Sequence, residues 1–427
     1  MAQEDKVINR RRVLQSAAAG VAAASFGGIM RPAFAAPKTI KIGLVMPSTG
    51  PLAFFTEHIP FTLNQVRKTL GGKIKINGTV YPYEIIIKDS QSNPNRASEV
   101  TQELILKDKV NLVAAFATPE TVNPVSDQCE VNGVPCITND APLEPYFFGR
   151  KGDPKKGFDW TAHFFWGVDD IANVFANLWD SLDTNKTVGA LWSNDPDGIA
   201  VSDQKTGFPP LLKARGFKLV DLGLYPTMSD DFSAQINALK AAKADIVTGV
   251  FVPPAFATFW TQSAQQGYRP KAATPAKALL FPTAVEALGD RGVNLSTEVW
   301  WSPHHPFKSG LTGETPQQFC DAYTKSTNRQ WTQPIGFKHA TLEVAIDVLR
   351  RAKAVDPKSI RDAIFTTNCN TIVGPVNFSN GPVKGVSRTP LVGGQWKRGT
   401  KWKYDLTIVN NKTAPNIPTG GKVEPIG

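Results

Sequence analysis

The sequence predicts an α/β protein built from two doubly wound parallel-sheet lobes, and three observations support this fold class. Short apolar runs alternate with longer runs of helical periodicity, which is typical of parallel sheets covered by helices on both faces. The alternation occurs twice, over about 39–140 and 187–301, which indicates two lobes. The expected strands end in Pro, Gly, Ser, Thr and Asn residues, at the edge where parallel sheets bind ligands.

The first block combines apolar strand-length runs with amphipathic helices. Strand runs are rich in β-branched residues, whereas the helical segments place apolar residues three or four apart, as in Val100 and Leu104. We therefore expect strands at 39–46, 83–88, 109–116 and 135–138, and helices at 97–107 and 121–131.

The second block repeats the pattern after an aromatic, Gly- and Pro-rich crossover at 142–170. A later amphipathic helix is expected at 337–353, and a hairpin at 396–410. The block itself predicts strands at 187–192, 218–224, 246–251, 278–281 and 298–301, and helices at 209–215, 231–242 and 255–266.

The N-terminal residues 1–35 predict an export signal. Arg10, Arg11 and Arg12 precede an uncharged run rich in Ala, Gly and Val, and Ala33-Phe34-Ala35 supplies a small-x-small cleavage site. The apolar run is too short to span a bilayer. Paired arginines resemble the twin-arginine signal, with an ordinary secretory signal or a basic disordered tail as alternatives. We expect cleavage near Ala35.

Composition excludes several classes of function. The net charge is +10, but the basic residues of the remaining chain are scattered, so a nucleic-acid partner is not expected. No P-loop, G-x-S-x-G or H-E-x-x-H motif is present, and the five histidines lack ligand spacing. We therefore expect no enzyme activity, no cofactor and no metal.

The four cysteines follow the predicted signal, in a chain expected to reach an oxidising compartment. Cys129 and Cys136 are close in sequence across a predicted helix end, a Gly turn and a strand start. We expect disulfides between Cys129 and Cys136 and between Cys320 and Cys369. Free buried thiols are the alternative.

Several segments, in their order along the chain, resemble the branched-chain amino acid binding family, the type I periplasmic binding proteins of ABC importers. They are Ile40-Lys41-Ile42-Gly43-Leu44, Ser48-Thr49-Gly50-Pro51-Leu52-Ala53, Gln91-Ser92-Asn93-Pro94, Asn123-Pro124-Val125-Ser126-Asp127, Asn132-Gly133-Val134-Pro135 and Ile372-Val373-Gly374-Pro375-Val376-Asn377-Phe378. The resemblance implies two lobes joined by three hinge strands that close on a ligand. The lobes are expected at 38–163 with 304–383, and at 164–303 with 384–420.

The resemblance also implies where the ligand binds. The hydroxyl residue that helps to hold a ligand carboxylate falls on Thr121, and the aromatic residue after the first strand falls on Phe55. The expected ligand-binding residues are Ser48, Phe54, Phe55, Thr118, Thr121, Thr138, Asp140, Trp166, Trp192, Asp197, Phe251, Val252 and Thr283.

Three positions that hold the α-ammonium in amino-acid binders are altered in this chain, where they fall on Thr283, Val252 and Asp197. A buried ammonium needs an anion, so we expect an apolar or aromatic solute, possibly with a carboxylate or amide, rather than a plain α-amino acid. The resemblance implies a monomeric periplasmic protein that delivers this solute to an ABC permease in the inner membrane. A ligand sensor on the same fold and an exported enzyme are the alternatives.

Overall fold

The computed structural model describes residues 38–427, and the predicted signal at 1–35 lies outside this range. The first lobe is built on a seven-stranded sheet with the order β14-β6-β5-β4-β1-β3-β2. All of its neighbouring strands run parallel except the β2/β3 hairpin. The strands are β1 (Ile40–Met46), β2 (Lys73–Ile76), β3 (Thr79–Asp89), β4 (Leu112–Ala115), β5 (Cys136–Thr138), β6 (Thr161–Phe164) and β14 (Val386–Ser387).

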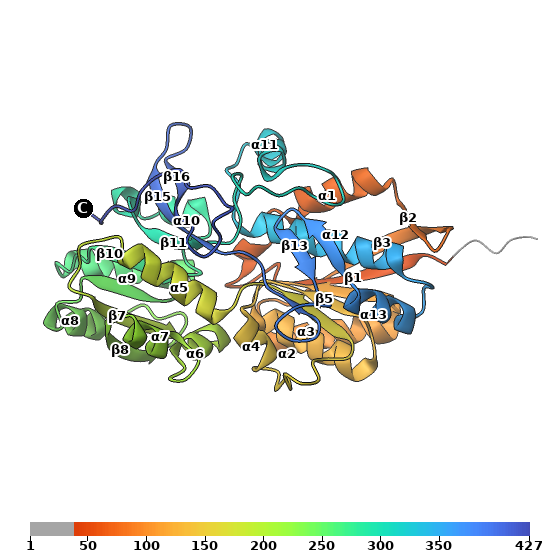
Figure 1. Ribbon diagram of the computed structural model, residues 1–427, viewed down its shortest axis with the longest axis horizontal. Coiled ribbons are helices and arrows are strands. Elements are labelled where there is room, and N and C mark those ends of the chain that lie inside the picture. Colours follow the sequence, from red (N-terminus) through yellow and green to blue (C-terminus); the bar gives the residue numbers. More distant parts are fainter. Residues whose placement is uncertain (1–37) are drawn as a thin grey trace, which may run out of the picture. The chain divides into compact units, whose positions relative to one another are not determined.

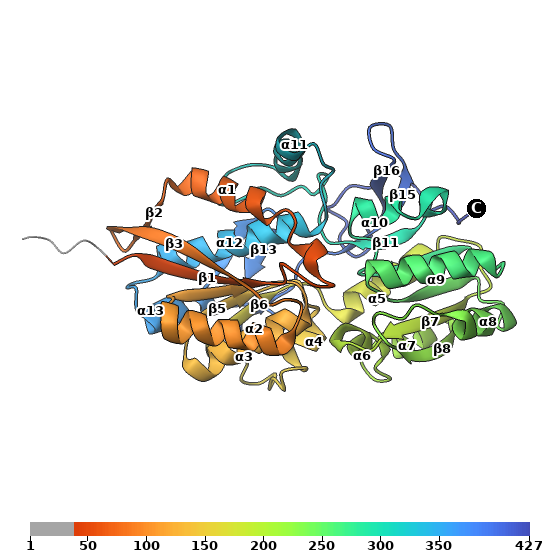
Figure 2. The same cartoon turned by 180° about the vertical axis from the view of Figure 1, so that it is seen from behind.

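Helices cover both faces of this sheet, as Figures 1 and 2 show, with α1 and α12 on one side and α2 and α3 on the other. The side chains of β1 explain why both faces need cover: Ile42 and Leu44 pack into one apolar cluster and Val45 into another. The helices of this lobe are α1 (Ile59–Leu70), α2 (Pro94–Gln102), α3 (Pro119–Asn132), α4 (Leu143–Phe147), α11 (Pro316–Thr327), α12 (Pro334–Arg351) and α13 (Pro357–Phe365). A short helix η1 (Ala53–Phe55), the π-helix η2 (Glu103–Asp108) and the pair β12 (Asn368–Thr371) and β13 (Gly374–Asn377) complete it.

The second lobe contains a four-stranded parallel sheet with the order β10-β9-β7-β8 and a separate antiparallel sheet with the order β11-β15-β16. The strands are β7 (Thr187–Ser193), β8 (Lys218–Tyr225), β9 (Ile246–Val250), β10 (Ala272–Ala276), β11 (Ser296–Val299), β15 (Val392–Arg398) and β16 (Tyr404–Asn410). The helices are α5 (Val168–Trp179), α6 (Pro196–Ser202), α7 (Phe208–Ala214), α8 (Ser233–Ala241), α9 (Pro253–Gln265), α10 (Pro282–Glu286) and η3 (Gly289–Gly292).

Three chain segments connect the lobes, which agrees with the expected three-stranded hinge. They follow β6, β11 and β14. The first and third lie side by side, because the N–H of Phe165 donates to the carbonyl of Ser387 (3.1 Å) and that of Thr389 donates to the carbonyl of Phe165 (3.3 Å). The second segment begins with Trp300, whose N–H donates to Gln333 Oε1 (2.8 Å).

The prediction of a strand at 278–281 is wrong. The observed strand is β10, Ala272–Ala276, which begins six residues earlier and contains Pro275. Proline is tolerated there because β10 lies at the edge of its sheet. Its alanine-rich sequence gives little β-propensity, which hid it from pattern analysis. The short strand β14 also pairs with β6 in the first lobe, although its residues fall in the range expected for the second.

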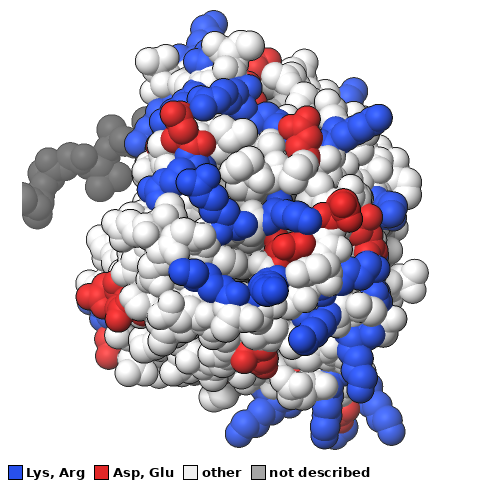
Figure 3. Space-filling view, turned by 90° about the vertical axis from the view of Figure 1, so that its left-hand side faces the viewer, with Lys and Arg blue, Asp and Glu red and all other residues white. Residues whose placement is uncertain are grey.

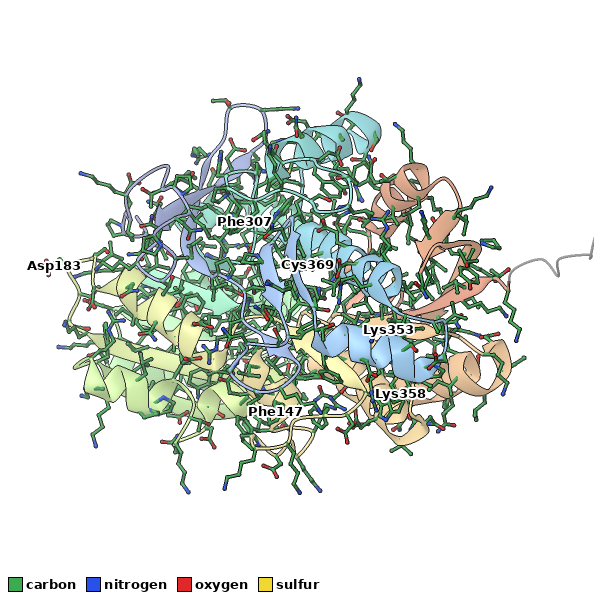
Figure 4. All side chains as sticks on the ribbon, turned by 45° about the vertical axis from the view of Figure 1, so that its right-hand side comes forward. Phe147, Asp183, Phe307, Lys353, Lys358 and Cys369 are labelled. Atoms are coloured by element: carbon green, nitrogen blue, oxygen red, sulfur yellow. The ribbon has the colours of Figure 1, made fainter. Side chains whose placement is uncertain are left out.

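Neither expected disulfide is present, because all four cysteines are free thiols. Cys129 on α3 and Cys136 on β5 are fully buried in one apolar cluster, where they fill space as small apolar side chains. Cys320 on α11 is buried in the main core, and Cys369 on β12, labelled in Figure 4, is half-buried.

The surface and helices of residues 38–427 add two observations. None of the helices in this range is both long and apolar enough to cross a membrane. On the face shown in Figure 3, Lys and Arg side chains are interspersed with Asp and Glu.

Candidate functional site

A small cavity lies between the two lobes, beside two of the three segments that connect them. Its free space is only about 30 Å³. Both lobes and two of the connecting segments supply its walls, so any molecule held there contacts both halves of the protein. The lining residues are Phe55, Thr118, Asp140, Pro142, Phe165, Trp166, Ile171, Asp197, Val201, Val250, Ala276, Lys277, Glu298 and Trp300.

The first-lobe wall is formed by loops at the carboxyl ends of parallel strands. Phe55 follows β1, Thr118 follows β4, and Asp140 follows β5. Thr118 precedes α3, and its hydroxyl donates to the carboxylate of Glu120 in the first turn of that helix. This is the edge at which open parallel sheets bind ligands.

Asp140 forms a fully buried ion pair with Lys338 of α12. The Lys338 ammonium also lies over two aromatic rings, 4.3 Å from the centre of Phe116 and 5.5 Å from that of Phe55. Such contacts stabilise a desolvated cation. Burial lowers the pKa of Lys338, whereas the adjacent Asp140 carboxylate favours its charged form. With both groups ionised, or with the proton shared so that both are neutral, the pair carries no net charge.

The second-lobe wall is centred on Lys277, which directly follows β10. Its ammonium lies 2.8 Å from Asp197 Oδ2 and 3.6 Å from Asp195 Oδ2. Its backbone N–H donates to Glu298 Oε1 (2.8 Å). All four side chains are buried, with two carboxylates at the Lys277 ammonium and a third, that of Glu298, at its backbone N–H.

Burial changes the proton affinity of these groups. Desolvation raises the pKa of Asp197 to about 7, although the attraction of Lys277 opposes the shift. Desolvation also raises the pKa of Glu298 to about 7. Burial disfavours the charge of Lys277, but Asp195 and Asp197 outweigh this effect and raise the pKa of Lys277. The lysine therefore stays charged, whereas the two carboxyl groups titrate near neutral pH.

Four aromatic side chains form the remaining wall. Phe165 lies 4.6 Å from Trp166 and 4.8 Å from Trp300 between ring centres, and Phe55 lies 6.2 Å from Trp300. The indole nitrogen of Trp166 is buried and has no hydrogen-bond partner among the described residues, whereas the Trp300 side chain interacts with the Glu298 carboxylate. A buried polar group without a partner is costly, so the Trp166 N–H is suited to a hydroxyl or other neutral acceptor on a bound molecule.

Comparison with known proteins agrees with this geometry. The family model described as periplasmic binding protein matches residues 39–401. The chain belongs to the periplasmic binding protein family. This result confirms the expected resemblance, and the family consists of binding proteins of transporters, not enzymes.

Individual relatives are distant but match over most of their length. "Leu/Ile/Val-binding protein homolog 7" of Brucella suis is 21% identical over 392 residues, which cover 88% of this chain and 94% of the relative. A leucine binding protein from Thermotoga maritima superposes with a TM-score of 0.72 at 17% identity, covering 88% of this chain and 99% of that one. A solute binding protein from R. palustris in complex with 4-hydroxybenzoate also gives a TM-score of 0.72 at 17% identity, covering 87% and 96%.

Of the residues expected at the site of this periplasmic binding protein, five line the cavity. They are Phe55, Thr118, Asp140, Trp166 and Asp197. Ser48 and Phe54 instead line an open groove of about 760 Å³ in the first lobe. The other expected residues lie elsewhere.

Two expected hydroxyl groups bond within the first lobe. Thr121 Oγ1 lies 3.0 Å from Ser90 Oγ, and Thr138 Oγ1 lies 2.8 Å from His163 Nδ1. Both threonines are fully buried. Thr121, where the family resemblance places a carboxylate contact, does not line the cavity.

The remaining expected residues belong to the second lobe. Trp192 is fully buried and donates its indole N–H to Asp221 (2.9 Å). Phe251 and Val252 pack in the second apolar cluster. Thr283 lines a separate pocket of about 150 Å³ together with Glu286. Thus two of the three altered ammonium positions, Val252 and Thr283, do not line the cavity.

Sequence analysis missed Phe165, Lys277, Glu298, Trp300 and Lys338. Lys277 was hidden because the strand before it was misplaced. Phe165 begins the first connecting segment and Trp300 begins the second, so a search for aromatic residues at lobe crossings would have found both. Lys338 lies within α12 and Glu298 within β11, and no motif or turn near either residue marks it as part of a site.

Ser309, His339 and Glu343 form a separate buried cluster in the first lobe. Ser309 Oγ lies 3.0 Å from His339 Nε2, but both side chains are buried and neither lines the cavity. Glu343 approaches the same ring nitrogen at 4.0 Å, so it does not orient the histidine as a catalytic third member would. Among the described residues, no three His, Cys, Asp or Glu side chains are grouped as a metal site requires.

Proposed function

We propose that this protein captures a small organic solute between its two lobes and delivers it to an ABC permease in the inner membrane. The single observation that supports this best is the cavity, because its walls come from both lobes and the segments that join them. A solute in such a place stabilises the closed arrangement through contacts that the open one lacks.

The size of the cavity supports a hinge mechanism. A space of about 30 Å³ holds about one water molecule, which is too little for an organic solute. Entry therefore requires the lobes to separate, and hinge residues 165–167, 300–302 and 388–391 are placed to absorb that motion. The permease then binds the closed conformation.

The walls favour a solute with an apolar or aromatic body. Phe55, Phe165, Trp166 and Trp300 supply flat apolar surface, and Ile171 and Val250 add aliphatic surface. Aromatic stacking contributes about 0.5–1.5 kcal/mol beyond simple burial. The solved neighbours bound to isoleucine and to 4-hydroxybenzoate show that this fold accommodates both kinds of molecule.

We also propose a periplasmic location, reached through a twin-arginine signal that is cleaved near Ala35. Arg10 and Arg11 carry this proposal. Replacing both by lysine should leave the protein in the cytoplasm with its first residues intact, whereas Arg31→Lys should not affect export. N-terminal sequencing of the periplasmic fraction decides the cleavage position. Export of the double variant at the normal level would exclude the twin-arginine route.

Solute binding and closure are tested on the exported protein. A thermal-shift panel of amino acids, aromatic acids, amides and amines should yield compounds that raise Tm, because a ligand stabilises the state it binds. Small-angle scattering with a saturating hit should then show a smaller radius of gyration. A periplasmic extract serves as a second source of candidate solutes. If neither the panel nor the extract raises Tm, solute capture is contradicted. A compound that raises Tm but leaves the radius of gyration unchanged would contradict hinge closure.

A further inference from the structure

We infer that the solute is an organic cation, an amine or quaternary ammonium compound with an apolar body and no carboxylate. This inference rests on the proposed solute-binding function and adds the charge of the ligand. It differs from the sequence-based expectation, because the carboxylates that carry it become neighbours only in the folded protein.

The first argument is the charge of the second-lobe wall. Asp195, Asp197 and Glu298 supply three carboxylates, and Lys277 supplies one ammonium. On the opposite wall, Asp140 and Lys338 cancel each other. Asp195 lies behind the lining residues, at the Lys277 ammonium. Above the pKa of about 7 of Asp197 and Glu298, this group carries two excess negative charges, and at lower pH protonation reduces the excess. A bound cation reduces this imbalance, whereas a bound carboxylate increases it.

The second argument is an unused acceptor. Asp197 Oδ2 accepts a hydrogen bond from the Lys277 ammonium. Asp197 Oδ1 is buried and has no hydrogen-bond partner among the described residues. Asp197 lines the cavity directly. A buried carboxylate oxygen without a donor is costly, and an ammonium N–H or a quaternary nitrogen beside it would offset that cost.

The third argument is the aromatic wall. Phe165, Trp166 and Trp300 lie within 6 Å of one another between ring centres and border the same cavity as Asp197. Aromatic faces attract cations, and aromatic cages recognise quaternary ammonium groups. Phe55 already lies beside one cation, Lys338. Aromatic faces next to excess carboxylates form a suitable environment for a desolvated organic cation.

The fourth argument concerns the place where a ligand carboxylate would bind. The start of α3 is suited to an anion. The hydroxyl of Thr118 there already donates a hydrogen bond to the carboxylate of Glu120, in the first turn of the helix. The hydroxyl of Thr121 is paired with Ser90. Glu120 also lies near enough to Asp197 and Lys277 to affect the pKa of both. A ligand carboxylate would meet an existing carboxylate here.

Proton release on cation binding supplies a second readout. The pKa values of Asp197 and Glu298 are raised to about 7 by burial. Lys277, Asp195 and Glu120 are the other charged groups facing Asp197. A bound cation favours the ionised carboxylates, so binding should release protons near neutral pH, and affinity for a cation should rise between pH 6 and 8.

The experiment compares probes of equal shape and different charge on the exported protein. Choline is compared with its neutral carbon isostere dimethylbutanol, and benzylammonium with benzyl alcohol and benzoate. We expect the cations to raise Tm and to bind at least about tenfold more tightly than their neutral isosteres. Calorimetry in two buffers of different ionisation enthalpy should show proton release.

Variants locate the effect. Asp197→Asn should weaken cation binding about tenfold or more and reduce proton release. Glu286→Gln, which removes a carboxylate outside the cavity, should leave cation binding unchanged. Circular dichroism and a cooperative melt establish that each variant is folded. If Asp197→Asn does not fold, proton release by the unaltered protein decides instead.

The outcomes separate the two proposals. Equal or tighter binding of benzyl alcohol, dimethylbutanol or benzoate would overturn the cation inference and leave solute capture intact. Binding of no cation in the set would also overturn it, while the broader panel and scattering measurement still judge solute capture. Cation binding that Asp197→Asn and Glu286→Gln affect equally would place the cation elsewhere and would overturn the inference.

Discussion

The ammonium of Lys277 lies 2.8 Å from Asp197 Oδ2 in the wall of the cavity between the lobes. Lys277 follows β10, and Asp197 lies in α6, so the pair joins two elements separated by 80 residues of chain. Both side chains are at least nine-tenths buried. The pair therefore depends on complete folding of the second lobe, and each charge depends on the other.

Removing the lysine should strongly destabilise the protein. Lys277→Met leaves Asp195 and Asp197 buried without their cation, and breaking a buried pair by removing one partner costs about 3–5 kcal/mol. Chemical denaturation should show a midpoint well below that of the unaltered chain. As a control, Lys358→Met removes an exposed lysine on α13 (Figure 4) that pairs with Asp362, and should cost less than about 0.5 kcal/mol. Equal midpoints for the two variants would show that the buried Lys277 pair stabilises the protein no more than the exposed Lys358 pair does.

The buried carboxyl of Glu298 should make stability depend on pH. Its pKa is about 7 in the folded protein against 4.5 in the unfolded chain. Folding therefore favours the protonated form, and this contribution to the free energy of unfolding is lost as pH rises from about 4.5 to 7. Glu298→Gln has no carboxyl group to titrate at this position. The free energy of unfolding of the variant, relative to that of the unaltered protein, should therefore be higher at pH 8 than at pH 5. A constant difference between the two proteins would show that Glu298 has an ordinary pKa.

The contact between Gly336 and Trp301 should tolerate no added methyl group. A Cβ on Gly336 would lie about 2.4 Å from the Trp301 ring, which follows β11 in the second connecting segment. Gly336→Ala should therefore lower the free energy of unfolding by about 1–3 kcal/mol, although alanine favours helix. Lys325→Ala on the exposed face of α11 serves as the control. A Gly336→Ala variant of unchanged or higher stability would mean that Trp301 moves freely.

The cysteines should behave as buried thiols. Desolvation raises the pKa of Cys129 and of Cys320, and both side chains are inaccessible. A thiol reagent should react slowly with the folded protein and with four groups after unfolding without reductant. Peptide mapping of exported protein under non-reducing conditions provides the check, and recovery of a Cys129–Cys136 crosslink would contradict the structure.

Much of the fold was predictable because its signals are local. Apolar runs identified β1, β7 and β9, and the turn between β15 and β16 marked their hairpin. Elements of weak local pattern were missed: β6 and α5 lie in or next to the aromatic crossover, and β10 is rich in alanine. These elements are held in place by contacts with neighbours distant in sequence, which no short window of sequence reports.

The sequence by itself determined the family, the two parallel sheets and the loops at their carboxyl ends, because periodicity and turn residues are encoded along the chain. It also indicated Phe55, Thr118, Asp140, Trp166 and Asp197, which line the cavity between the lobes. Only the tertiary structure decided that Lys277 and Glu298 join Asp197, and that Lys338 neutralises Asp140. The physical reason is that the charge and pKa of a site depend on distance and burial, and both are set by the packing of segments far apart in the sequence.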